Sequence, residues 1–232
     1  MAMQALADVL ANTNANDTES NENPQEPINT SHPNHQPIPN PRECFVGEIV
    51  MVGTSSMFNT EVLVKDKEDT ELRVGFAFPP DGYGYEGVPT EFLKRGLTML
   101  ILHPSRIAMN GGGELIVVHN PKHIKILPFR MSFYLRLCER VTEFRSVVGR
   151  QRICFGCETR KYGLERCPRC KMSYFCSRAC QAESLSRKGH RRDCGIIRDP
   201  DITALLLGKW EQLGEFRSVS LQAHLQQVPD IL

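Results

Sequence analysis

Four pairs of potential metal ligands lie in one short stretch of the chain. Seven of its nine cysteines fall between residues 154 and 194, together with one histidine. Zinc prefers thiolate and imidazole ligands, and a structural zinc site takes four of them. The eight residues therefore predict two closed zinc sites per chain. The pairs are Cys154 with Cys157, Cys167 with Cys170, Cys176 with Cys180, and His190 with Cys194.

Two other uses of these cysteines fit the sequence less well. Disulfides need an oxidising compartment, but residues 1–12 contain no Lys or Arg and no apolar run long enough for a secretory signal. A reduced apolar core is also excluded, because residues 149–194 are mostly polar. Each structural zinc site contributes roughly 10–16 kcal/mol of apparent binding energy, which such a segment needs in order to fold.

The spacing limits how the pairs combine. A C-x2-C pair is typical of a turn, and a pair four residues apart places both side chains on one face of a helix. We prefer one turn and one helix per site, which excludes one of the three ways to divide the four pairs. The other two remain open on spacing alone.

The ligand order resembles that of the MYND-type zinc finger, with Tyr174-Phe175-Cys176-Ser177 and Cys180-Gln181 as further matching residues. The resemblance covers residues 154–194. It implies a cross-braced arrangement, in which the pairs bind alternately. The first zinc would then bind Cys154, Cys157, Cys176 and Cys180, and the second Cys167, Cys170, His190 and Cys194.

The resemblance also implies a protein-interaction adaptor whose partner is a protein or peptide. Gln181 matches a position on the peptide-facing helix of the family. Leu185 stands where the family favours a tryptophan that lines a groove for proline-rich peptides, so we expect such a peptide to bind weakly. Arg178, on the same segment, is a candidate contact for acidic flanking residues.

The net charge of +1 gives no general attraction to nucleic acid or to a membrane surface. Between Arg150 and Arg192, however, twelve Lys or Arg stand against three Glu. Seven thiolates and two zinc ions sum to a charge of −3, so part of this surplus offsets the metal sites themselves. We therefore expect a protein partner rather than nucleic acid.

The rest of the chain predicts an α+β protein. Residues 1–43 form a disordered Asn/Pro-rich tail, 44–130 a β-rich domain, 131–149 a connecting helix, 150–195 the finger and 196–232 C-terminal helices. Six short strands predict a small antiparallel, barrel-like sheet, with an OB-like barrel favoured and an SH3-like barrel or a meander as alternatives. The strands are 45–52, 61–65, 72–78, 97–102, 115–118 and 124–127.

Three helices are predicted outside the finger. The clearest is Ser132–Val148, whose apolar stripe includes Cys138 as a core thiol and which Gly149 would cap. The stretches 201–216 and 218–228 also have helical spacing. Cys44 begins a strand and needs no chemical role.

Two other function classes fit parts of the sequence. An OB-like domain could bind single-stranded nucleic acid, with Tyr83 and Tyr85 as stacking residues. A SET-MYND-like methyltransferase fragment is the enzyme alternative, since residues 34–40 superficially resemble the asparagine-histidine motif of those enzymes, but the cysteine of that motif is missing. We expect no enzyme and no membrane span, and an intracellular protein of the cytoplasm or nucleus.

Overall fold

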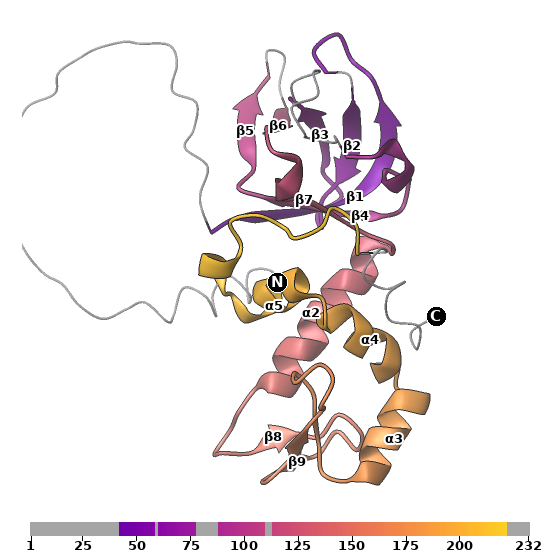
Figure 1. Cartoon of the computed structure of the whole chain (residues 1–232), viewed down its shortest axis with the longest axis vertical. Coiled ribbons are helices and arrows are strands. Elements are labelled where there is room, and N and C mark those ends of the chain that lie inside the picture. Colours follow the sequence, from indigo (N-terminus) through magenta and orange to yellow (C-terminus); the bar gives the residue numbers. More distant parts are fainter. Residues whose placement is uncertain (1–41, 59, 78–87, 110–112, 222–232) are drawn as a thin grey trace, which may run out of the picture. The chain divides into compact units, whose positions relative to one another are not determined.

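The computed structural model describes residues 42–58, 60–77, 88–109 and 113–221. Within these ranges a seven-stranded sheet is followed by four α-helices and two short two-stranded ribbons (Figure 1). The predicted α+β class is confirmed. Several predicted features lie outside the described residues, namely the tail up to residue 41, the motif at 34–40, Tyr83 and Tyr85, and residues 222–228 of the last predicted helix.

The large sheet has the strand order β5-β6-β3-β2-β1-β4-β7. The prediction of a purely antiparallel sheet is wrong at one pair, because β3 and β6 are parallel while the other pairs are antiparallel. All six predicted strands are present, and β5 was missed because its side chains are exposed or half-buried and show no apolar alternation. The strands are β1 (Cys44–Gly53), β2 (Glu61–Lys65), β3 (Glu71–Phe76), β4 (Thr98–Leu102), β5 (Ser105–Ala108), β6 (Glu114–Val118) and β7 (Ile124–Leu127).

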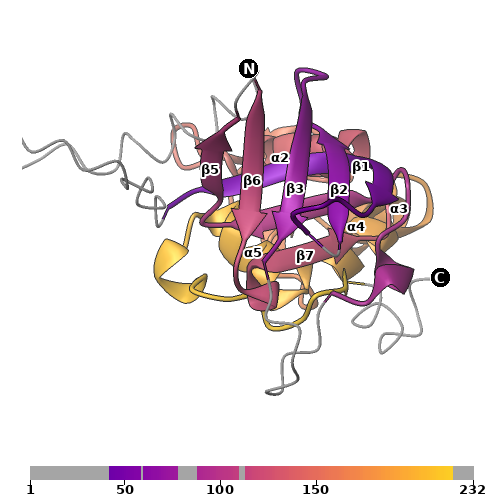
Figure 2. The same ribbon diagram turned by 90° about the horizontal axis from the view of Figure 1, so that it is seen from above.

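Alternating side chains build the core of this sheet. Val62 and Val64 of β2 are fully buried, and they pack with equivalent positions of β3 and β6, the strands that lie side by side in Figure 2. A register shift between Ile49 and Met51 marks a bulge in β1. The bulge divides this long strand into a part that pairs with β4 and a part that pairs mainly with β2.

The helix α2 (Met131–Arg145) buries its predicted stripe, including Cys138. The predicted end of this helix is wrong. Ser146 caps it, and Val148 is 57 % exposed instead of extending the stripe. Gly149 (φ 55°) and Arg150 (φ 67°) form a tight turn, across which Val148 and Gln151 exchange backbone hydrogen bonds. Gly149 is therefore a turn residue, and not a helix cap.

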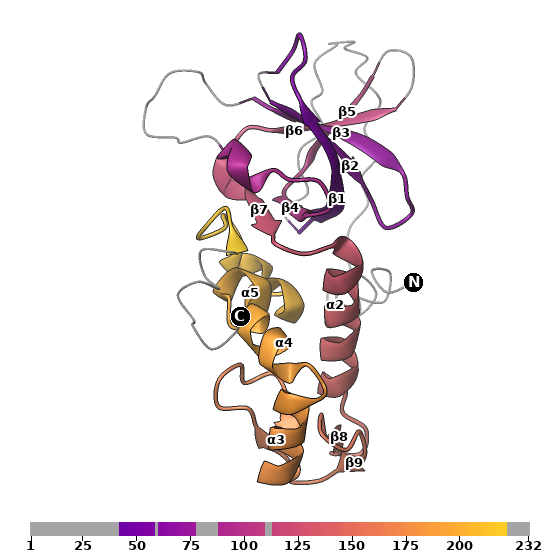
Figure 3. The same cartoon turned by 90° about the vertical axis from the view of Figure 1, so that its right-hand side faces the viewer.

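Three shorter helices follow, α3 (Arg178–Ser186), α4 (His190–Ile197) and α5 (Pro200–Leu207), as Figure 3 shows. The predicted helix at 201–216 is wrong beyond Leu207, because Gly208 takes a left-handed conformation (φ 64°) and ends it. The predicted helix at 218–228 is also wrong at its start. Residues 219 and 220 run along β7, where the Ile126 N–H donates to the Val219 carbonyl at 2.6 Å.

A buried ion pair joins β7 to α5. Lys125 is fully buried, with its Nζ 3.1 Å from Asp199 Oδ2 and 2.6 Å from Asp201 Oδ2. The other oxygen of Asp199 caps α5 by accepting from the N–H groups of Asp201 and Ile202. The helix that follows the finger is thus held against the sheet by charge as well as by apolar packing.

Candidate metal centre

Two β-hairpins and two helices position the eight candidate ligands. The first hairpin consists of β8 (Arg152–Ile153) and β9 (Arg160–Lys161), and the second of β10 (Glu165–Arg166) and β11 (Tyr174–Phe175). Each hairpin holds one C-x2-C pair in the loop between its strands. Helices α3 and α4 supply Cys180, His190 and Cys194, and Cys176 lies between β11 and α3.

The two C-x2-C turns have the same backbone geometry. In the first, the Glu158 N–H donates to the Cys154 carbonyl at 2.7 Å, and in the second the Lys171 N–H donates to the Cys167 carbonyl at 2.9 Å. Glu158 (φ 59°) and Lys171 (φ 58°) both adopt the left-handed conformation, although neither is glycine. This repeated turn brings the two sulfurs of each pair to one side.

Gly156 allows the first turn to approach α3 closely. A Cβ at this position would lie 2.4 Å from the Cys180 Cβ and 2.5 Å from the Cys180 carbonyl oxygen. Real carbon atoms do not approach so closely, and the backbone oxygen has no flexible end that could move aside. The first turn and the start of α3 therefore fit together only with glycine here.

Only one of the two ligand pairs that the sequence assigned to helices is fully helical. His190 and Cys194 lie in α4, one turn apart, as predicted. The prediction of a helical pair at Cys176 and Cys180 is wrong, because Cys176 precedes the helix. The hydroxyl of Ser177 caps α3 and accepts from the Cys180 N–H, so only Cys180 belongs to the first helical turn.

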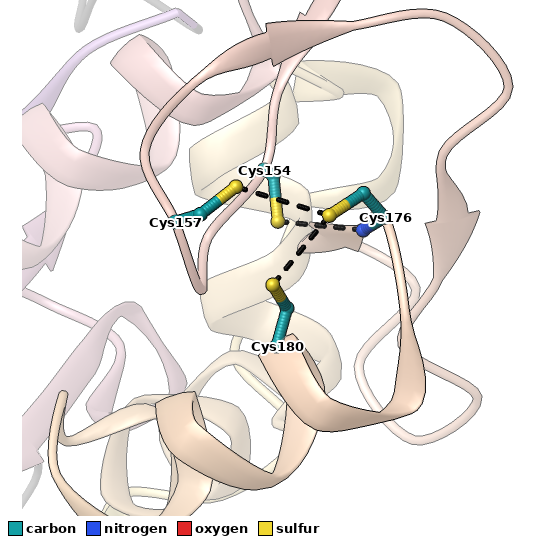
Figure 4. Close-up of side chains that lie close together, drawn as sticks. All are labelled: Cys154, Cys157, Cys176 and Cys180. Atoms are coloured by element: carbon teal, nitrogen blue, oxygen red, sulfur yellow. Dashed lines mark hydrogen bonds between the residues drawn. The ribbon is translucent and has the colours of Figure 1, made fainter.

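The structure brings the eight side chains into two clusters, each with its ligand atoms within 4.8 Å of one another. The first holds Cys154, Cys157, Cys176 and Cys180. Figure 4 shows its sulfurs facing each other, with Cys176 Sγ 3.8 Å from Cys157 Sγ and 3.5 Å from Cys180 Sγ. The Cys176 N–H donates to the Cys154 sulfur at 3.3 Å.

The second cluster holds Cys167, Cys170, His190 and Cys194, all of which are buried. Cys167 Sγ lies 3.9 Å from Cys194 Sγ and 3.4 Å from His190 Nε2. The other ring nitrogen of His190, Nδ1, lies 3.4 Å from the Ser173 hydroxyl. A histidine ligand is commonly oriented through its second nitrogen in this way.

These spacings fit tetrahedral zinc. With Zn–S bonds of about 2.3 Å and Zn–N bonds of about 2.0 Å, the edges of the tetrahedron are about 3.8 Å between sulfurs and about 3.5 Å from nitrogen to sulfur. The observed distances of 3.5–3.9 Å between sulfurs and 3.4 Å from nitrogen to sulfur agree with these values. All nine cysteines are free of disulfides.

The clusters change the pKa of several thiols in different directions: it is lowered for Cys157, Cys167 and Cys170, whereas hydrogen bonding with Cys167 raises that of Cys194. Hydrogen bonds from the Thr159 hydroxyl and backbone lower the pKa of Cys157 to about 6. Burial would lower the pKa of His190, but the sulfurs of Cys167 and Cys170 outweigh it and raise the pKa to about 9. In the absence of metal this histidine therefore holds a proton between the sulfurs, and metal binding must displace it.

A shell of aromatic and charged groups encloses the second cluster. The rings of Phe155 and Phe175 lie 5.0 Å and 5.3 Å from the His190 ring. Arg140 of α2 lies over Phe155 and forms an ion pair with the buried Asp193 at 2.8 Å. Sequence reasoning missed these supporting residues, since nothing in their spacing connects α2 with the ligands.

Two four-ligand clusters whose ligand pairs alternate along the chain define a small structural zinc finger. Residues 154–194 match the family model of the MYND finger, and this segment is a MYND-type zinc finger. No match was found among curated proteins. Within the described ranges, no helix is both long and apolar enough to cross a membrane.

The three predicted partner-binding residues all lie on α3. Arg178 is exposed, whereas Gln181 and Leu185 are half-buried. Their spacing of three and four residues puts them on one face of the helix.

Proposed function

We propose that the chain is a non-catalytic adaptor in which two zinc ions hold a finger that binds a protein partner. One observation carries this proposal. Each cluster already offers four ligands at tetrahedral spacing, so a bound zinc keeps no position open for water or substrate. MYND fingers generally mediate protein–protein interaction, and the surface of α3 is the part of this finger that we assign to the partner.

The partner we favour is a short proline-rich peptide, bound along the face of α3 that holds Arg178, Gln181 and Leu185. The Gln181 amide can both donate to and accept from a peptide backbone. Leu185 offers an apolar contact but no flat stacking surface, so a dissociation constant in the tens of micromolar is expected, about 6 kcal/mol of binding free energy.

Two further features complete the proposal. We infer an OB-like barrel for the large sheet, since β1, β2 and β3 form a meander, β3 pairs in parallel with β6, and only His103 and Pro104 separate β4 from β5.

Seven thiolate ligands are best kept reduced inside a cell, so we place the protein in the cytoplasm or nucleus.

The test is a titration of a labelled proline-rich peptide against zinc-loaded protein. Elemental analysis should first give a zinc-to-chain ratio near two. Leu185→Trp should strengthen peptide binding and Gln181→Ala should weaken it. If no variant binds the peptide, α3 is not the partner surface, and a zinc ratio near one would overturn the two-site assignment.

A further inference from the structure

Most of the cationic side chains on and beside the finger are exposed, but they differ in whether a carboxylate pairs with them. Lys188 lies 2.6 Å from Glu158, and Arg187 lies 3.5 Å from Glu183. In the part of the chain that the structure describes, no carboxylate lies within ion-pair distance of Arg145, Arg152 or Arg166. Two of them, Arg152 and Arg166, nevertheless lie over one ring, and Arg145 contacts Arg152.

That ring is Tyr174 of β11. Arg166 is its direct cross-strand partner on β10, and the carbon at the centre of the Arg166 guanidinium lies 5.6 Å from the ring centroid. On the neighbouring strand, the Phe155 N–H donates to the Tyr174 carbonyl at 2.8 Å, which brings the end of β8 alongside. The Arg152 guanidinium lies 4.6 Å from the same centroid.

Arg145, the last residue of α2, completes the group. Its carbonyl accepts from Arg152 Nη1 at 2.9 Å, and its own Nη1 donates to the Leu206 carbonyl at 3.4 Å. Burial lowers the pKa of the Arg145 guanidinium, and the positive charge of Arg152 lowers it further, with Tyr174 acting in the opposite direction. The protein thus assembles like charges without neutralising them.

We propose that Arg145, Arg152 and Arg166 form an anion-binding site for a carboxylate or phosphate on an acidic segment of a protein partner. Planar guanidinium groups bind both anions with paired hydrogen bonds, and the donors that these side chains have not used remain available. The site rests on the proposed function as a protein-binding finger, but it lies on the two hairpins and the end of α2 and does not involve the α3 face.

Nucleic acid fits this site less well than an acidic peptide. Single-stranded nucleic acid is held by bases that stack on accessible aromatic rings along a basic track. The Tyr174 side chain is only 8 % exposed, and two guanidinium groups already lie over its ring. A phosphate or carboxylate can reach the arginines, whereas a base has no free ring to stack on.

The experiment measures binding of labelled peptides to the zinc-loaded 232-residue chain by fluorescence anisotropy. The probes are a peptide with three glutamates, the same peptide with three phosphoserines, and a neutral version with three glutamines. We expect both acidic probes to bind and the neutral one not to. Arg152→Gln and Arg166→Gln should each weaken binding about tenfold, since each removes charged hydrogen bonds.

The matched control is Arg191→Gln, which removes an exposed arginine from α4 and should leave affinity within twofold. Arg166→Gln is the cleaner of the two site variants, because no hydrogen bond of the Arg166 side chain within the described residues is lost. If all three substitutions weaken peptide binding equally, net charge alone explains the binding, and the proposed site is overturned. The site would also be overturned if neither acidic peptide bound, or if a labelled oligothymidine bound through Arg152 and Arg166 instead. The proline-rich titration reports separately on α3, so the two failures can be told apart.

Discussion

Replacing Lys125 by methionine tests how firmly the helices after the finger are attached to the sheet. The substitution keeps an unbranched side chain of nearly the same length but removes the buried cation of Asp199 and Asp201, both nearly fully buried; the largely exposed Arg217, 4.0 Å from Asp201, stays in place. Removing one partner of a buried ion pair costs about 3–5 kcal/mol, because the remaining charge is buried and uncompensated. For a domain of this size, that cost lowers the midpoint of thermal unfolding by roughly 10 °C.

The assay is urea and thermal unfolding followed by the fluorescence of the single tryptophan, Trp210, in the short 3-10 helix Trp210–Gln212 that follows α5. Lys122→Met is the control, since Lys122 is 55 % exposed and its pair with Glu215 contributes less than about 1 kcal/mol. Changing both aspartates to asparagine in the Lys125→Met background should restore part of the loss. If Lys125→Met is no more destabilising than Lys122→Met, the buried pair does not hold α5 to the sheet.

Three further predictions concern the finger and the core thiols. Gly156→Ala should lower the zinc content or the chelator resistance of the first cluster, because the added Cβ would lie 2.4 Å from the Cys180 side chain. Gly214→Ala is the control and should change neither, since nothing lies within 4 Å of a Cβ there. Cys157→Ala should reduce the zinc ratio from two toward one, and a loss of both ions would contradict two separable sites. Burial raises the pKa of Cys44 and of Cys138 to about 12, so both thiols should stay protonated and resist iodoacetamide at pH 8.5. Rapid labelling of the native protein, detected by mass spectrometry, would show that they are not protected.

The sequence predicted best where side-chain periodicity and burial coincide. The strand 61–65 was predicted with its observed bounds because Val62 and Val64 alternate with half-buried neighbours. The strand Ser105–Ala108 has no such alternation, since its pairing with β6 supplies hydrogen bonds while its side chains remain exposed or half-buried. A strand that pairs through its backbone without burying apolar side chains has no apolar alternation from which it could be predicted.

Helix ends were harder to predict than helix centres, because glycine has several uses. Gly149 follows an apolar stripe and so suggested a cap, but it forms a hairpin turn with Arg150, and the helix ends at Arg145. Gly208 does end a helix, and there the prediction extended past it. For the metal centre, ligand types and spacing singled out the eight candidate residues, and their division into two sets came from the family resemblance. The supporting Arg140 and Asp193 depend on tertiary contacts that no local pattern contains.

The course of the chain after the second cluster bears on how any binding experiment should be designed. Cys194 lies in α4, and only four residues separate it from Asp199, which caps α5 and pairs with Lys125 of the sheet. A fragment that begins at α2 would keep both metal clusters but lose the sheet with Lys125, so Asp199 and Asp201 would lose their buried cation and become exposed to water close to Cys194. Weak peptide binding by such a fragment would then report damaged packing as much as the properties of the finger. The sheet and the finger are therefore best tested together in the whole chain, with single substitutions in place of truncations.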